Sequence, residues 1–118
     1  MKKILVIDDD RDILEVVKLI LTNHQFEVET IFNWKLISST IQTYSPHLIL
    51  LDVSLGGADG RVICKQLKDA NETQDIPLIL FSANHNLVNN LGDCEPDAIM
   101  TKPFDGSNLV STIQKHLS

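Results

Sequence analysis

Short apolar runs alternate with longer amphipathic segments along the whole chain. Each run is bounded by polar residues, and most are nearly free of polar residues inside. This pattern is typical of strands that are buried on both faces of a parallel sheet. It predicts five strands, at Lys3–Asp8, Phe26–Ile31, Leu48–Asp52, Pro77–Phe81 and Asp97–Thr101.

The segments between the runs carry apolar residues at three- and four-residue spacing, which indicates helices with one buried face. Residues that favour helix N-caps precede them. The predicted helices run from Asp10 to about His24, from Trp34 (capped by Asn33) to Tyr44, from Arg61 (after Asp59-Gly60) to about Ala70, over Asn84–Leu91, and from Asp105 to the end. Leu36 and Val62 are expected to face inward. The Asn84–Leu91 segment contains four asparagines and precedes Gly92 and Pro96, so this fourth helix should be short or irregular.

The alternation of strands and helices predicts five βα units. Such units form a parallel sheet with helices on both faces and right-handed crossovers, which is the α/β class. The 118 residues contain no linker, repeat or low-complexity tract and are enough to bury a full core, so residues 1–118 are interpreted as one domain.

Composition is that of an ordinary globular protein, with 43% hydrophobic and 22% charged residues. The formal net charge of −6 argues against a surface for direct nucleic-acid or membrane binding. No apolar run approaches the length of a signal-peptide core or of a membrane span, and the default location is therefore the cytoplasm. Cys64 and Cys94 lack metal-ligand spacing and are interpreted as reduced thiols.

Acidic residues follow two of the predicted strands. Asp8 ends the first strand and Asp9 follows it, and Asp52 ends the third. Side chains at the carboxyl ends of neighbouring parallel strands converge, so these acids should share one pocket. Two like charges about 4 Å apart repel by roughly 4 kcal/mol at an effective dielectric of 20, so either one acid is protonated or positive charge balances them. Lys102, after the fifth strand, supplies one such charge, and a divalent cation would supply the rest.

The chain resembles a known family, the receiver domains of bacterial two-component response regulators. Five motifs carry the resemblance, in order: Asp8-Asp9, Asp52 after the run LILL, Asp59-Gly60, Ser82-Ala83 and Lys102-Pro103-Phe104. The resemblance implies a flavodoxin-like, doubly wound five-stranded sheet of order 2-1-3-4-5 with five helices.

The resemblance also implies roles for individual residues and partners. Asp52 would accept a phosphoryl group from a phosphohistidine on a sensor histidine kinase or phosphotransfer protein. The implied Mg²⁺ ligands are Asp8, Asp9, Asp52 and the backbone carbonyl of Ser54. The implied donors to the phosphoryl oxygens are Lys102, the Ser82 hydroxyl and the Ala83 backbone N–H. The family relation further allows a homodimer through the face made by the fourth helix, fifth strand and fifth helix.

One position departs from the family pattern. Receiver domains usually carry Tyr, Phe or His three residues before the lysine, whereas this chain has Ile99. An isoleucine has no ring to rotate, so we expect phosphorylation to occur with a weak conformational readout, or with a readout through Asn84–Leu91.

Other functions remain open at this stage. A haloacid-dehalogenase-like phosphatase would use Asp8 as its nucleophile in the motif Asp8-x-Asp10. A pseudoreceiver would keep the fold and act by binding alone. Asp9 could also be a plain helix cap, and Lys102 a solvated loop lysine.

Overall fold

The computed structural model describes residues 1–83 and 86–117. Strands and helices follow each other in the predicted order. The elements are β1 (Lys3–Ile7), α1 (Arg11–Asn23), β2 (Glu27–Ile31), the 3₁₀ turn η1 (Trp34–Leu36), α2 (Ile37–Tyr44), β3 (Leu48–Asp52), α3 (Gly60–Asp69), β4 (Leu78–Ser82), the 3₁₀ turn η2 (Leu87–Asn90), β5 (Ala98–Thr101) and α4 (Gly106–Leu117).

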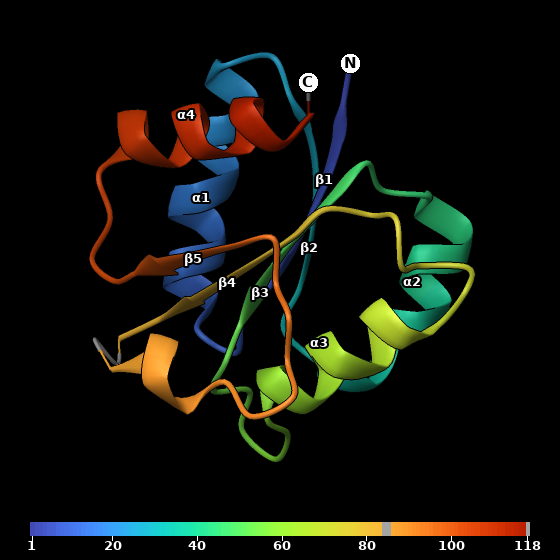
Figure 1. The fold of residues 1–118 in the computed structure, drawn as a ribbon. Coiled ribbons are helices and arrows are strands. Elements are labelled where there is room, and N and C mark those ends of the chain that lie inside the picture. Colours follow the sequence, from blue (N-terminus) through green and yellow to red (C-terminus); the bar gives the residue numbers. More distant parts are fainter. Residues whose placement is uncertain (84–85, 118) are drawn as a thin grey trace.

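All five strands form one parallel sheet of order β2-β1-β3-β4-β5, as predicted. Figure 1 shows α1 and α4 on one face of this sheet and α2 and α3 on the other. Each face buries its own hydrophobic cluster. This is the flavodoxin-like arrangement that the family resemblance implied.

The expectation of five helices is wrong for the described residues, which contain four α-helices. Where the fourth helix was expected, the chain makes the 3₁₀ turn η2, whose preceding residue makes no side-chain capping bond. Asparagines are poor helix formers, and Gly92 follows with a φ of +63°, so the segment turns away after η2. Asn84 and His85, the first two residues of the predicted segment, lie outside the described residues. Because of this loss, the expected fifth helix is α4 in Figure 1.

Short polar side chains precede three of the four described α-helices, as predicted. The exception is α2, because Asn33, the predicted cap of that helix, instead accepts a hydrogen bond from the Lys35 N–H in η1. Asp10 accepts hydrogen bonds from the backbone N–H groups of Asp12 and Ile13, and Asp59 accepts one from Arg61. Asp105 accepts one from Ser107 in the same way. Each of these carboxylates satisfies a donor that the first helical turn cannot pair internally.

Two predicted core residues are instead exposed. Leu36 is 48% exposed because it belongs to the 3₁₀ turn η1, whose tighter period turns it away from the sheet. Val62 is 56% exposed, since it lies about 100° around α3 from its buried neighbour Ile63.

Cys64 and Cys94 are buried free thiols, in agreement with the sequence interpretation. Among the described residues, no helix is both long and apolar enough to cross a bilayer.

Strand alternation determines which side chains reach the carboxyl edge together. In β1 and β3, Ile4, Val6, Leu48 and Leu50 face the α1/α4 cluster. Successive strand residues point to opposite faces, so the acids at even positions, Asp8 and Asp52, continue on this same side.

Candidate functional site

Three carboxylates gather at the carboxyl edge of the sheet. Asp8 follows β1, Asp52 ends the neighbouring β3, and Asp9 comes directly after Asp8. One oxygen from each lies within 4.8 Å of the others. Asp8 is fully buried and Asp52 is 3% exposed, whereas Asp9 faces solvent. The cluster therefore has two buried acids and one exposed acid.

Lys102 reaches this cluster from the end of β5. Its Nζ lies 2.8 Å from Asp8 Oδ2 and 3.3 Å from Asp52 Oδ1. The backbone N–H of Lys102 donates to the Ser82 carbonyl over 2.8 Å, which fixes the lysine backbone against the end of β4. The interpretation of Lys102 as a solvated loop lysine is therefore wrong.

Burial and mutual repulsion control the charges in the pocket. Burial, followed by the charge of Asp8, raises the pKa of Asp52 to about 7, although Lys102 opposes the rise. The pKa of Asp9 is also raised, by desolvation and by its contact with Asp8. Burial alone would lower the pKa of Lys102, but the bond to Asp8 and the charge of Asp52 outweigh it and raise that pKa. A single ammonium does not compensate the three carboxylates.

The donor set fits Mg²⁺. This ion prefers oxygen ligands and is usually held by a few carboxylates while it keeps several waters. The three acids offer such oxygens at close range, and with Lys102 they leave a formal excess of two negative charges, which one divalent cation balances.

The β3–α3 loop passes close to the acids because it contains glycines. Gly56 has a φ of +56°, and a β-carbon there would lie 3.3 Å from Asp9 Oδ2. A β-carbon on Gly60 would collide with the backbone carbonyl oxygen of Asp52. Gly60 also donates its N–H to Val53 over 2.7 Å. The motif Asp59-Gly60 thus starts α3 directly against the end of β3.

Asp59 belongs to this loop and not to the acid cluster. Arg61 forms an ion pair with it at 2.7 Å, and their hydrogen bonds hold the pKa of Asp59 below its usual value. The Arg61 guanidinium also donates to the carbonyl of Asn90 in η2. Sequence analysis did not single out Arg61, because an arginine at the start of a helix has no distinctive pattern.

The other predicted residues lie around the same edge. Ser82 is buried at the end of β4 and pairs with Thr101 of β5. Ala83 is exposed and, with Lys102, Pro103 and Phe104, lines a hollow of about 400 Å³ that is closed on the other side by α1. Ser54 is exposed and bridges to Asp59 across the loop. Their roles toward a phosphoryl group or an ion stay predictions.

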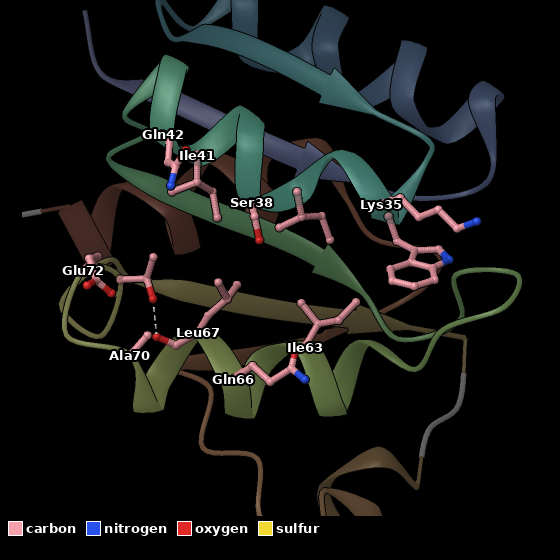
Figure 2. A pocket seen from close by; sticks show the side chains of 12 residues that line it. Lys35, Ser38, Ile41, Gln42, Ile63, Gln66, Leu67, Ala70 and Glu72 are labelled. Carbon is pink, nitrogen blue, oxygen red and sulfur yellow. Dashed lines mark hydrogen bonds between the residues drawn. The ribbon is translucent and has the colours of Figure 1, made fainter.

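A larger hollow, of about 460 Å³, lies between α2 and α3 (Figure 2). Ile41, Ile63 and Leu67 point into it from the two helices, while the Lys35 side chain extends away. Thr73 also lines the hollow and donates a hydrogen bond to the Leu67 carbonyl. Because the carboxylate cluster is made by other residues, this groove is separate from the candidate site.

An aromatic ring also touches the site. Phe81, the residue before Ser82, is fully buried, and the Nζ of Lys102 lies 4.9 Å from the centre of its ring. Phe104 packs edge-on against the same ring at 6.0 Å between centroids, with the two planes at 76°. Sequence analysis missed this role because Phe81 resembles any other apolar residue of a buried strand.

Comparisons with known proteins agree on one family. Residues 4–114 match the family model described as the response regulator receiver domain. The nisin biosynthesis regulatory protein NisR of Lactococcus lactis subsp. lactis is 34% identical over 98% of the chain, but the chain spans only 50% of NisR.

Solved structures give the same result. The receiver domain of a signal transduction histidine kinase from Syntrophus aciditrophicus is 27% identical, with a TM-score of 0.90 over 99% of this chain and 90% of that one. The chemotaxis response regulator CheY4 of Vibrio cholerae shares the fold at 23% identity, with a TM-score of 0.89 over 99% of each chain.

Proposed function

The chain belongs to the response regulator receiver domain family of two-component systems, and from this premise we propose that residues 1–118 form a single receiver domain with Asp52 as its phosphoacceptor. The observation that carries the proposal is the position of Asp52, nearly buried beside Asp8 and within 3.3 Å of the Lys102 ammonium. A carboxylate held against a fixed cation is poised to attack an anionic phosphoryl group, since the cation offsets the repulsion between them.

The hydrogen bonds favour Asp52 over Asp8 as the nucleophile. Asp8 Oδ1 accepts from the backbone N–H of Asp10 at 2.9 Å, and its Oδ2 accepts from Lys102 at 2.8 Å. Both oxygens of Asp8 are therefore engaged, while the ion pair of Asp52 uses Oδ1. This arrangement supports the receiver over the haloacid-dehalogenase-like alternative, in which Asp8 would attack.

Asp8, Asp9 and Asp52, with the backbone carbonyl of Ser54, would hold Mg²⁺. Bound there, the ion supplies positive charge that offsets the charge of the carboxylates and of the incoming phosphoryl group. Receiver domains of this family typically bind Mg²⁺, and the oxygen cluster of this chain has the composition for it.

Asp52 and three hydrogen-bond donors would act on the phosphoryl group itself. An Asp52 oxygen attacks phosphorus in line, the bond from phosphorus to the imidazole nitrogen of the donor phosphohistidine breaks, and the histidine leaves with its electron pair. The Lys102 ammonium, the Ser82 hydroxyl and the Ala83 backbone N–H donate to the equatorial oxygens as charge develops on them. No cofactor beyond the ion is needed for this transfer.

Partners follow from the family. A receiver domain implies a sensor histidine kinase or phosphotransfer protein as the donor. We propose that this domain relays a conformational signal, without direct contact to nucleic acid or membrane, in the cytoplasm. A homodimer through η2, β5 and α4 stays a prediction. The chain covers half of NisR, so the output of a longer protein is outside the proposal.

The test is phosphorylation by acetyl phosphate with and without Mg²⁺, followed by peptide mapping of the acyl phosphate. We expect one labelled site, Asp52, in the unmodified chain, and no label in Asp52→Asn. Asp75→Asn, which removes a carboxylate from an exposed loop, is the matched control and should label normally. Label at Asp8 would support the phosphatase alternative. No label in a chain that stays folded would support the pseudoreceiver.

A further inference from the structure

The ring of Phe81 lies in a position to hold the ammonium of Lys102. The distance of 4.9 Å from Nζ to the ring centre is within the range, about 6 Å, at which a cation is attracted by the face of an aromatic ring. Phe81 is fully buried, and the Lys102 side chain is only 17% exposed. The contact is therefore largely shielded from water. Attraction between a cation and an aromatic ring is strongest at such desolvated sites.

Strand geometry makes the contact a fixed feature of the fold. Phe81 pairs in register with Asp52 of the adjacent β3, so the ring and the carboxylate stand next to each other at the same level of the sheet. Ile79 and Phe81 face the α1/α4 cluster, the side on which Asp8 and Asp52 also lie. The ring therefore lies beside the acids and beneath the lysine that reaches over them.

Phe104 also packs against the Phe81 ring. Its ring meets that of Phe81 at 76°, an edge-to-face geometry that aromatic pairs favour. Lys102 and Phe104 are separated by one residue, so the same short segment after β5 places a cation and an aromatic edge against one ring. This pairing ties the conformation of the segment to the position of the ammonium.

We propose that Phe81 is a positioning residue, whose ring, supported by Phe104, holds the Lys102 ammonium over Asp8 and Asp52 by a cation–π contact and so sets the rate of phosphorylation of Asp52. In this role the ring acts only through the lysine. This inference rests on the proposed function, because the rate belongs to that reaction. Lysine is long and flexible, and two acids alone would hold it in several geometries.

Fluorination of the ring tests the contact without emptying the core. Site-specific replacement of Phe81 by 4-fluoro-, 3,5-difluoro- and 3,4,5-trifluorophenylalanine withdraws electrons from the ring face stepwise, with little change in volume. We expect the phosphorylation rate with acetyl phosphate to fall at each step, by about fivefold across the series. The same series at Phe26, which is buried in the same cluster and is not in contact with Lys102, should leave the rate unchanged. A purely structural role for Phe81 would not follow the number of fluorines.

A second measurement is independent of phosphorylation. Protons on the Lys102 side chain that lie over the Phe81 ring should appear upfield in ¹H–¹³C spectra and return to ordinary positions in Phe81→Leu, with urea unfolding confirming that this variant folds. A flat rate across the Phe81 series, or an ordinary Lys102 shift in the unmodified chain, overturns the inference. If Asp52 takes no label in any form of the chain, the proposed function is wrong, and so is the claim that Phe81 sets the rate of phosphorylation. An upfield Lys102 shift in the same chain would still support the placement of the ammonium by the ring.

Discussion

Replacing Asp52 by asparagine should stabilise the protein at neutral and higher pH when no divalent cation is present. Asparagine keeps the shape of the side chain and removes the charge that the pocket disfavours. It also leaves Lys102 paired with Asp8 at 2.8 Å, so no buried charge loses its partner. The prediction therefore isolates the cost of one carboxylate in a 3% exposed position.

The magnitude follows from the pKa of Asp52. A rise from 3.8 to about 7 means that ionising this group in the folded state costs about 4 kcal/mol more than in the unfolded chain. Between these two pKa values the native state binds more protons than the unfolded state. The contribution of Asp52 to the free energy of unfolding therefore becomes more unfavourable as pH rises from about 4 to 7. Above about pH 7 this contribution stays constant. Allowing for water entering the pocket, we expect Asp52→Asn to gain about 2 to 4 kcal/mol at pH 8.

The assay is urea unfolding followed by the fluorescence of Trp34, the single tryptophan, from pH 4.5 to 8 in the presence of a chelator. The difference in unfolding free energy between Asp52→Asn and the unmodified chain should grow with pH by at most about 1.4 kcal/mol per pH unit. Asp75→Asn removes the same charge from an exposed loop and should show no such growth. Saturating Mg²⁺ should narrow this difference, because binding stabilises the unmodified chain by about 2.7 kcal/mol at a concentration one hundred times the dissociation constant. A difference that does not change with pH would refute the reasoning.

Three further predictions concern neighbouring parts of the site. Lys102→Met should abolish phosphorylation. It should also lower the free energy of unfolding in urea at pH 8 by about 3 kcal/mol, because it leaves Asp8 buried without a cation. A loss below about 1 kcal/mol would contradict the buried ion pair. Gly60→Ala should lower stability by about 3 kcal/mol in thermal unfolding, because the new β-carbon meets the Asp52 carbonyl. Gly106→Ala should be nearly neutral, because its β-carbon would lie 3.4 Å from the Ile20 side chain. Equal effects of the two substitutions would argue against the close approach at Gly60. Backbone NMR shifts on adding a beryllofluoride mimic should spare β5 in the unmodified chain and spread into it in Ile99→Tyr, and a full rearrangement of β5 with Ile99 present would reject the weak-readout hypothesis.

The sequence alone determined the order of strands and helices, since the period of apolar residues is a local property. The runs around Leu50 and Leu80 could only be buried strands, and Asp10, Asp59 and Asp105 could be identified as caps from their position before amphipathic segments. The weakness of the segment before Gly92 was likewise visible in its asparagines, although its 3₁₀ form was not. Exposure of Val62 was missed because neighbouring positions on a helix differ by about 100° and the pattern did not resolve which faced the sheet.

Only the tertiary structure decided how the acids, the lysine and the ring are combined. Their positions at the carboxyl ends of strands predicted that Asp8, Asp52 and Lys102 would meet, but the bond to Asp8 Oδ2 comes from a lysine 94 positions away in the chain. The contact of Phe81 with Lys102 depends on strand register, which no local pattern encodes. The charge and aromatic contacts of the site join segments that are distant in the sequence. They form only when the sheet brings the carboxyl ends of its strands together.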